Sequence, residues 1–283
     1  MSLPTQKGVI HAAYDLGNTV MYASKSDPRF SYCLYVPKTF SKEMERQPRL
    51  VVAMHGTTRT SFYEFREALA EFARWNNCIV LCPMFPVGVL GDGNRNGYKY
   101  LREGSIRYDN ALLDIVDEVR ENYGLEDRRF ALFGFSGGGH FVHRFYLLHP
   151  ERLWAVSIGA PGSVTLLDAE KDWWVGVRNV EEIFGRPIDV DALGKVPVHM
   201  VVGEADLETW EITHQPTSPL YMEGANDSGR TRPERLRTLQ ASFERQGIKV
   251  QFDGVPGVTH DRMKCIERTK DFFHHVLKEE GHL

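Results

Sequence analysis

The chain has 283 residues, of which 42% are hydrophobic, so it is long enough to bury a large core. Its formal net charge of −4 is spread along the sequence without blocks of one sign, which argues against nucleic acid or an anionic membrane surface as a partner. No apolar stretch approaches the roughly 20 residues that cross a bilayer. Residues 1–17 lack the basic start and apolar run of a secretion signal.

The cysteines, at positions 33, 78, 82 and 265, follow no CxxC spacing. Cys78 and Cys82 fall on one predicted strand, where residues i and i+4 lie too far apart for a disulfide. We therefore expect four reduced thiols and a cytoplasmic protein. The sequence leaves the oligomeric state open, a homo-oligomer included.

Short apolar runs alternate along the chain with segments of helical periodicity. The apolar runs predict strands at 31–37, 49–56, 78–83, 128–135, 153–160, 196–206 and 248–255. The periodic segments predict helices at 60–77, 106–124, 137–150, 231–247 and 261–279. This alternation is typical of the α/β class, in which a mostly parallel sheet carries helices on both faces.

Two of the predicted helices begin with a capping-box pattern. Ser61 and Glu64 form the pattern in the helix at 60–77, and Thr231 and Glu234 form it in the helix at 231–247. In this pattern the hydroxyl of the first residue accepts a hydrogen bond from the backbone of the second. We therefore expect Ser61 and Thr231 to cap their helices.

Three long connections interrupt the alternation, at 86–105, 161–195 and 207–230. Each follows a predicted strand, so each leaves the carboxyl edge of the sheet, where α/β proteins bind ligands. We expect a single domain over residues 1–283, with a lid-like insertion at about 161–195 and a second long loop at about 207–230.

These connections contain the candidate substrate-binding residues Tyr98, Trp173 and Trp174. One tryptophan could line a pocket while its neighbour packs, or both could pack the insertion onto the domain. Arg102 or Arg107 could bind a substrate carboxylate, although solvated loop charges are the simpler interpretation.

The segment Gly134-Phe135-Ser136-Gly137-Gly138 fits the pattern G-x-S-x-G and lies between a predicted strand and a predicted helix. That context is the one that a nucleophile elbow requires. Glycine at 134 and 138 removes side chains that would collide at the sharp turn, so the Ser136 hydroxyl can stand exposed. The backbone N–H of Gly137 starts the helix and could stabilise an oxyanion. The alternative is an ordinary glycine-rich turn.

A serine nucleophile needs a base and an acid that orients the base. In a fold of this kind the chain order is serine, acid, histidine. Asp206 follows the strand at 196–206, with Glu204 and Glu208 close by, and His260 follows the strand at 248–255. We expect Asp206 and His260 to complete a catalytic triad.

The loop His55-Gly56-Thr57-Thr58 follows an early strand, from which this fold takes its second oxyanion donor. The N–H of Thr57 is the first candidate and that of Thr58 the second, and Thr58 is also a candidate contact for substrate. The alternative is an ordinary strand-to-helix turn.

The motifs "HGTT", "GFSGGG", "VGEAD" and "GVTHD" together resemble the α/β-hydrolase superfamily over about residues 30–280. "LYVPKTF" before "VVAMHGTT" is similar to the serine-esterase branch of poly(3-hydroxybutyrate) depolymerase-like and feruloyl-esterase-like proteins. The resemblance implies hydrolysis of carboxylic esters without a metal or organic cofactor. By it, Ser136 is the nucleophile, His260 the base and Asp206 its orienter, with oxyanion donors at Thr57 and Gly137.

The motifs lead to one function hypothesis and two alternatives. The first is a hydrolase for a small or medium carboxylic ester. The same triad could instead hydrolyse a C–C bond, an amide or a lactone, or transfer an acyl group to an alcohol. A non-catalytic protein that binds a small molecule is the third hypothesis. His140 and His143 could share a helix face, but no HExxH pattern accompanies them, so we expect no metal site.

Overall fold

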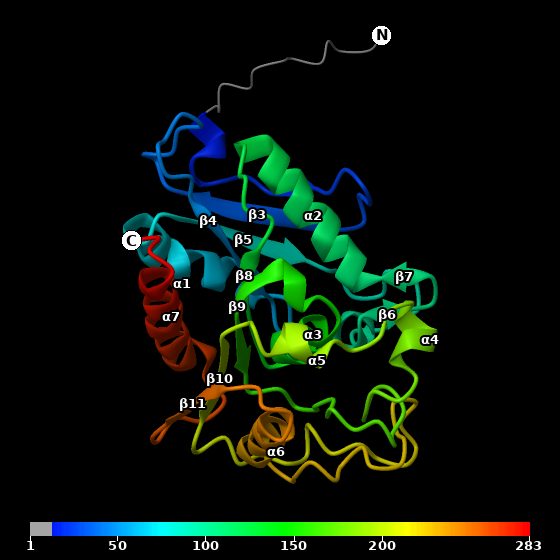
Figure 1. The fold of residues 1–283 in the computed structure, drawn as a ribbon. Coiled ribbons are helices and arrows are strands. Elements are labelled where there is room, and N and C mark those ends of the chain that lie inside the picture. Colours follow the sequence, from blue (N-terminus) through cyan, green and yellow to red (C-terminus); the bar gives the residue numbers. More distant parts are fainter. Residues whose placement is uncertain (1–12) are drawn as a thin grey trace.

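The computed structural model describes residues 13–283, so most of the segment tested for a secretion signal lies outside the described residues. A nine-stranded sheet forms the centre of the molecule, in the order β1-β3-β5-β4-β8-β9-β10-β11, with β2 paired to β3 (Figure 1). Its strands are β1 (Gly17–Asn18), β2 (Tyr22–Ala23), β3 (Ser31–Val36), β4 (Arg49–Met54), β5 (Cys78–Met84), β8 (Phe130–Phe135), β9 (Leu153–Gly159), β10 (Val198–Gly203) and β11 (Val250–Val255). A separate hairpin contains β6 (Arg102–Glu103) and β7 (Ile106–Arg107).

Every neighbouring pair from β5 through β11 is parallel, whereas β3 runs antiparallel to β5, and β1 and β2 run antiparallel to β3. Each of the seven predicted strands is present, and the predicted mostly parallel sheet is confirmed. Because parallel strands point the same way, the loops that follow β4, β8, β10 and β11 all leave one edge of the sheet.

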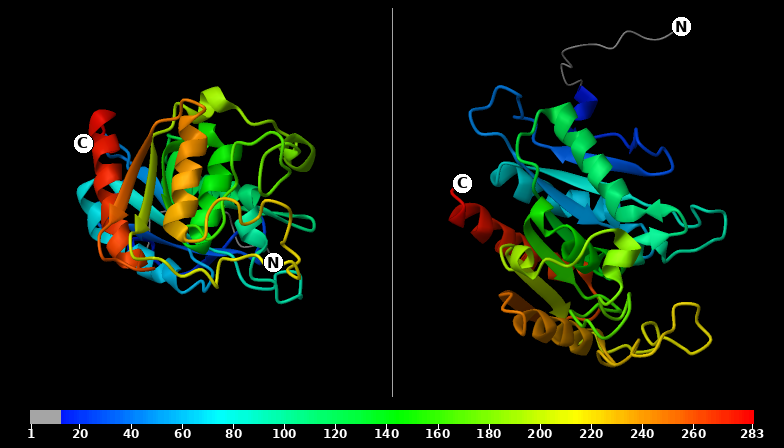
Figure 2. Two further views of the ribbon diagram at one scale, coloured as in Figure 1. Left: turned by 90° about the horizontal axis from the view of Figure 1, so that it is seen from below. Right: turned by 45° about the vertical axis from the view of Figure 1, so that its right-hand side comes forward.

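Helices cover both faces of the sheet, as predicted. The helices are α1 (Ser61–Trp75), α2 (Tyr108–Tyr123), α3 (Gly137–Leu148), α4 (Val180–Phe184), α5 (Val190–Leu193), α6 (Arg232–Glu244) and α7 (Arg262–Glu279). Helices α1 and α7 lie together on one face, and α2, α3 and α6 lie on the other (Figures 1 and 2). None of the helices within residues 13–283 is both long and apolar enough to cross a membrane.

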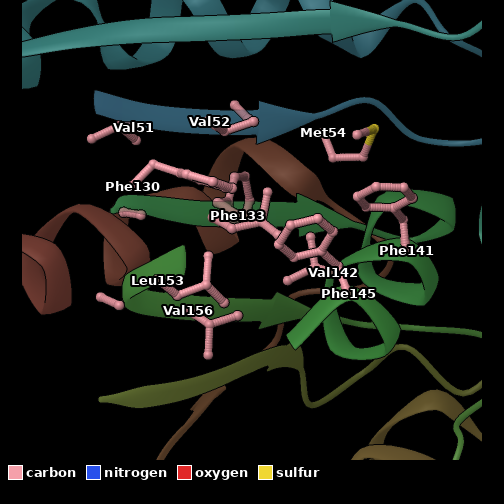
Figure 3. Packing of buried hydrophobic residues seen from close by; sticks show 14 of the residues in the cluster. Val51, Val52, Met54, Phe130, Phe133, Phe141, Val142, Phe145, Leu153 and Val156 are labelled. Carbon is pink, nitrogen blue, oxygen red and sulfur yellow. The ribbon is translucent and has the colours of Figure 1, made fainter. Parts of the chain in front are cut away.

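Strand β8, which leads to Ser136, is buried along its whole length. Successive side chains of a strand point to opposite faces. Phe130 accordingly contacts Phe145 of α3, while Phe133 packs edge-on against Phe65 of α1 with ring centroids 5.1 Å apart. Figure 3 shows the result around β4, β8 and β9, with α3 contributing Phe141, Val142 and Phe145. This two-sided packing fixes the end of β8, and therefore the position of the serine that follows it.

The three long connections gather beyond the carboxyl ends of the strands. The segment 86–105 contains a short 3₁₀ helix, Gly97–Tyr100. The segment 161–195 contains the short helices α4 and α5, and the segment 207–230 contains neither helix nor strand. In the right-hand view of Figure 2 the segment 207–230, coloured yellow to gold, projects from the lower right of the molecule.

Candidate active site

Ser136 occupies the turn between β8 and α3 with φ 57° and ψ −117°, a backbone conformation that residues other than glycine rarely adopt. The neighbouring glycines leave room for this turn. A Cβ on Gly134 would lie 2.6 Å from the carbonyl carbon of Gly138, and a Cβ on Gly138 would lie 2.4 Å from the Met54 carbonyl oxygen. The glycines are therefore required by backbone contacts, and the turn has the geometry of a nucleophile elbow.

His260 and Asp206 meet although they are separated by β11 and α6. His260 Nδ1 lies 2.6 Å from Asp206 Oδ2, and the His260 ring stands 4.8 Å from the ring of Phe135, the residue before Ser136. The side chain of Asp206 is 1% exposed, whereas that of His260 is 28% exposed. A buried carboxylate at Nδ1 fixes the imidazole ring and leaves Nε2 on the open side.

The two loops that carry this pair are joined through their backbones. The Ala205 N–H donates to the Val258 carbonyl at 2.9 Å, and a Cβ on Gly203 would lie 2.2 Å from the same oxygen. Glu204 and Glu208, the nearby acids in the sequence, are exposed. The structure thus brings Asp206, and neither glutamate, to His260.

Thr57 lies beside Gly137, since a Cβ on Gly137 would come within 2.7 Å of the Thr57 backbone nitrogen. Gly137 is the first residue of α3, so its N–H has no acceptor within the helix. Among residues 13–283 the Thr57 and Gly137 amides donate no hydrogen bond. The two N–H groups that the sequence proposes for an oxyanion hole are neighbours, and both are available to a ligand.

The capping prediction for Ser61 is wrong. Thr60 is the N-cap residue of α1 and makes no side-chain capping bond, while Ser61 already lies within the helix. The Ser61 hydroxyl instead accepts from the Gly56 N–H at 2.8 Å, and Glu64 pairs with Arg262. The serine therefore holds the Thr57 loop in place. At α6 the prediction is confirmed, because Thr231 accepts from the Glu234 N–H.

Three histidines pack against the site as neutral hydrogen-bonding groups. Nε2 accepts a backbone N–H in each case, from Phe85 to His55, from Gly162 to His140 and from Thr165 to His143. Burial lowers the pKa of all three, and that of His55 falls to about 3. His140 and His143 thereby tie the start of the 161–195 insertion to α3, a role that their spacing in the sequence did not predict. No group of three or more histidine, cysteine, aspartate or glutamate side chains in the described part of the chain is arranged to hold a metal ion.

Two cavities meet at Ser136. A cavity of about 260 Å³ is bordered by Ser136, Thr57, Lys99, His140 and residues of the 207–230 loop. A smaller one of about 130 Å³ is bordered by Ser136, Thr57, Thr58 and His260. The candidate contact residue Thr58 thus borders the smaller cavity, and the serine has open space on two sides.

The other candidate contact residues do not border the two cavities at Ser136. Trp173 and Trp174 border a third cavity of about 490 Å³, and both also pack the insertion. Trp174 is 6% exposed, contacts Tyr100 and donates from Nε1 to the Leu220 carbonyl at 3.1 Å, whereas Trp173 packs edge-on against Phe184. Tyr98 is buried behind the Thr57 loop, where its ring contacts His55, so its position suits support of that loop rather than contact with substrate.

No protein-family model matches the sequence, and no curated protein matches it. Solved structures are similar in fold. Poly(aspartic acid) hydrolase-1 from Sphingomonas sp. KT-1 matches with a TM-score of 0.70 and 20% identity over 86% of this chain and 92% of that one. The LpqC poly(3-hydroxybutyrate) depolymerase from Bordetella parapertussis matches with a TM-score of 0.70 and 21% identity over 94% of this chain and 91% of that one. A ferulic acid esterase matches with a TM-score of 0.56 and 14% identity over 92% and 93% of the two chains.

The similarity extends over 86–94% of this chain and 91–93% of the other chains, so it covers nearly the whole fold. They include the depolymerase and feruloyl-esterase types that the motifs resemble. The resemblance is therefore confirmed at the level of fold, and the chain has the α/β-hydrolase fold.

Proposed function

We propose that this chain is a serine hydrolase that cleaves small or medium carboxylic esters through an acyl-enzyme intermediate. The observation that carries the proposal is the 2.6 Å contact between His260 Nδ1 and Asp206 Oδ2, made by a histidine that borders the same cavity as Ser136. The names of the structural neighbours, which include a poly(3-hydroxybutyrate) depolymerase and a ferulic acid esterase, support an ester as the substrate.

In the acylation step the Ser136 hydroxyl attacks the ester carbonyl while His260 Nε2 takes its proton. The imidazolium that forms is stabilised by the Asp206 carboxylate, which stays ionised. The carbonyl oxygen becomes an oxyanion, and the Thr57 and Gly137 N–H groups donate to it. His260 then gives its proton to the departing alkoxide, so the alcohol leaves and the acyl group remains on Ser136.

In the deacylation step a water molecule takes the place of the alcohol. His260 removes a proton from the water as its oxygen attacks the acyl carbonyl, and the same two N–H groups stabilise the second oxyanion. Collapse of this intermediate breaks the bond to Ser136, which regains its proton from His260. The carboxylic acid is released and the site is restored.

Hydrolysis of p-nitrophenyl esters of increasing acyl length tests the proposal. Ser136→Ala should lower kcat by about 10⁴-fold or more, because the nucleophile is lost. Ser41→Ala, at an exposed serine far from the site in sequence, is the matched control and should keep wild-type activity. Circular dichroism of each variant checks that it is folded. Ester hydrolysis retained by a folded Ser136→Ala variant would overturn the assignment.

Labelling with an organophosphonate separates this proposal from a non-catalytic binding protein. An activated serine should add one phosphonyl group per chain, and mass spectrometry should locate it on the peptide that contains Ser136. Adding an alcohol acceptor, an amide or a lactone to the assay separates ester hydrolysis from the other reactions open to the same triad.

We also propose that the protein acts in the cytoplasm. The four cysteines are buried free thiols, which supports a reducing compartment. Cell fractionation with an antibody against the chain tests this proposal.

A further inference from the structure

Three buried or partly buried cations surround the 260 Å³ cavity without a carboxylate partner in the described structure. Arg144 donates to the Lys99 carbonyl and to the hydroxyls of Thr165 and Ser163. Arg235 donates to backbone carbonyls, including that of Gly162, and to the Asn226 amide oxygen. Among residues 13–283 no acidic side chain forms an ion pair with either guanidinium group. Arg144 instead lies over the rings of Tyr100 and Trp174, and the charge of Glu234 acts on Arg235 without direct contact.

Lys99 is the third cation, and it borders the cavity itself together with Ser136. Its ammonium group donates to the Asn96 amide oxygen at 2.8 Å and to no other group in the described part of the chain. An ammonium group has three N–H donors. Two of the Lys99 donors are therefore open to a ligand in the cavity.

The carboxylates near the cavity are already engaged elsewhere. Glu211, at the rim, pairs with Arg232, and Arg232 also pairs with Asp206. Lys99 therefore forms no ion pair with a carboxylate among the described residues, although the charge of Glu211 acts on it. These cations also act on His214, which borders the same cavity. Burial and the charges of Arg235, Arg144 and Lys99 lower the pKa of His214 to about 4.

We propose that the cavity beside Ser136 binds a carboxylate of the substrate through Lys99, so that the preferred esters carry a negative charge. The inference rests on the proposed function and names a substrate class for it. A monoanion suits the cavity better than a phosphate dianion, because the Glu211 carboxylate at the rim would repel a second negative charge. Arg144 and Arg235 strengthen the attraction from behind the cavity wall without touching the ligand.

The charge of the substrate is the first experimental variable. Monoethyl succinate, which carries a carboxylate on its acyl group, is compared with the neutral ester ethyl butanoate. The ester 4-acetoxybutanoate, with its carboxylate on the alcohol side, is compared with the neutral ester butyl acetate. The wild-type protein should show a kcat/KM at least tenfold higher for the anionic member of one pair, and the pair identifies the side of the ester that enters the cavity.

The second variable is Lys99. Lys99→Met keeps an unbranched side chain, one heavy atom shorter, and removes its charge. Lys249→Met, at an exposed lysine, is the matched control. Lys99→Met should lower kcat/KM at least tenfold more for the anionic ester than for the neutral one, mainly through KM. An equal loss for both esters, or no charge preference in the wild-type protein, would overturn the carboxylate site.

A binding measurement keeps this inference separate from the proposed function. Calorimetric titration of Ser136→Ala with butanoate, a monoanion, requires no turnover, and butanoate should bind more tightly than inorganic phosphate. Butanoate binding without any ester hydrolysis would refute the esterase and leave the anion site standing. Hydrolysis of neutral esters without butanoate binding would refute the anion site and leave the esterase standing, and tighter phosphate binding would overturn the choice of a carboxylate.

The pH dependence supplies a readout that needs no variant. Burial and the charges of Arg59, Arg144 and Arg95, opposed by Glu211, lower the pKa of Lys99 to about 8. The ammonium loses its charge as the pH rises through this value. Butanoate affinity of the Ser136→Ala protein should therefore fall between pH 7 and pH 9, and an affinity that stays constant would contradict the role of Lys99.

Discussion

Arg232 donates from Nη1 to Asp206 Oδ1 at 3.0 Å, on the carboxylate oxygen that His260 leaves free. The two side chains are 2% and 1% exposed, so this is a buried ion pair. The second terminal nitrogen of Arg232 reaches Glu211, and its Nε has no partner among the described residues. The guanidinium group therefore holds the acid of the candidate triad from behind.

Replacing Arg232 should damage both stability and activity. In Arg232→Met the buried Asp206 carboxylate would keep only the hydrogen bond to His260, and loss of one member of a buried pair costs about 3–5 kcal/mol in the free energy of unfolding. We expect a loss in this range, and kcat at least tenfold lower, because Asp206 becomes free to turn away from His260. Urea unfolding and ester hydrolysis measure the two effects.

Arg245→Met is the matched control, since Arg245 is exposed at the end of the same helix. It should change the free energy of unfolding by less than about 0.5 kcal/mol. If Arg232→Met behaved like this control, the position of Asp206 would not depend on Arg232.

A methyl group at position 137 should obstruct the oxyanion hole. The added Cβ would lie 2.4 Å from the Tyr98 hydroxyl and 2.7 Å from the Thr57 nitrogen, so the Thr57 backbone would have to move. We expect Gly137→Ala to lower kcat by about 10²–10³-fold, the usual cost of losing one oxyanion donor. In Gly194→Ala the nearest atom is 3.6 Å away and the backbone is helical, so this control should keep full activity. A Gly137→Ala protein with wild-type kcat would exclude Thr57 as a donor.

The strained turn at Ser136 has a measurable cost. At φ 57° and ψ −117° a Cβ is unfavourable by about 1–3 kcal/mol, which exceeds the entropic cost of glycine of roughly 0.5–1 kcal/mol. Ser136→Gly should therefore be more stable than Ser136→Ala by about 1 kcal/mol in denaturant unfolding. At Arg268, an exposed position within α7, the order should reverse and alanine should be the more stable replacement. If alanine were the more stable replacement at both positions, Ser136 would be unstrained.

The sequence predicted the features that are encoded locally. The sequence of β8 is a continuous apolar run, because the sheet buries both faces of this strand. The role of Gly134 follows from its close contact with Gly138 within the turn, so the motif alone carries it. Gly138 also avoids the Met54 carbonyl of a neighbouring strand, a contact that the motif does not report. The order of serine, acid and histidine along the chain then led to Asp206 and His260.

The sequence could not predict the features that depend on distant contacts. Ser61 has a capping pattern, but tertiary structure offers it the Gly56 N–H instead. Arg107, one candidate for binding a carboxylate, pairs with Asp109, whereas Lys99, in the connection before it, forms no ion pair among the described residues. Whether a cation forms an ion pair depends on contacts in the folded chain, so the spacing of residues in the sequence does not predict it.

The three buried histidines should make the protein sensitive to acid. His55, His140 and His143 each accept a backbone N–H through Nε2, so protonation would break that bond and bury a charge. Their pKa values in the folded state lie below the ordinary value of about 6.5, because burial disfavours the charged ring. Below pH 6.5 the unfolded chain therefore binds more protons than the folded one, and stability is full above this pH and lost as the pH falls.

Each histidine should contribute up to about 1.4 kcal/mol per pH unit to this loss. Urea unfolding at pH 7.5, 6.5 and 5.5 measures the slope. His143→Gln, whose amide oxygen can still accept from the Thr165 N–H, should reduce the slope by the share of one histidine. His275→Gln, at an exposed ring, should leave the slope unchanged. A free energy of unfolding that stays constant between pH 7.5 and 5.5 would mean that the folded and unfolded chains bind the same number of protons. That result would contradict the lowered pKa values of the three histidines.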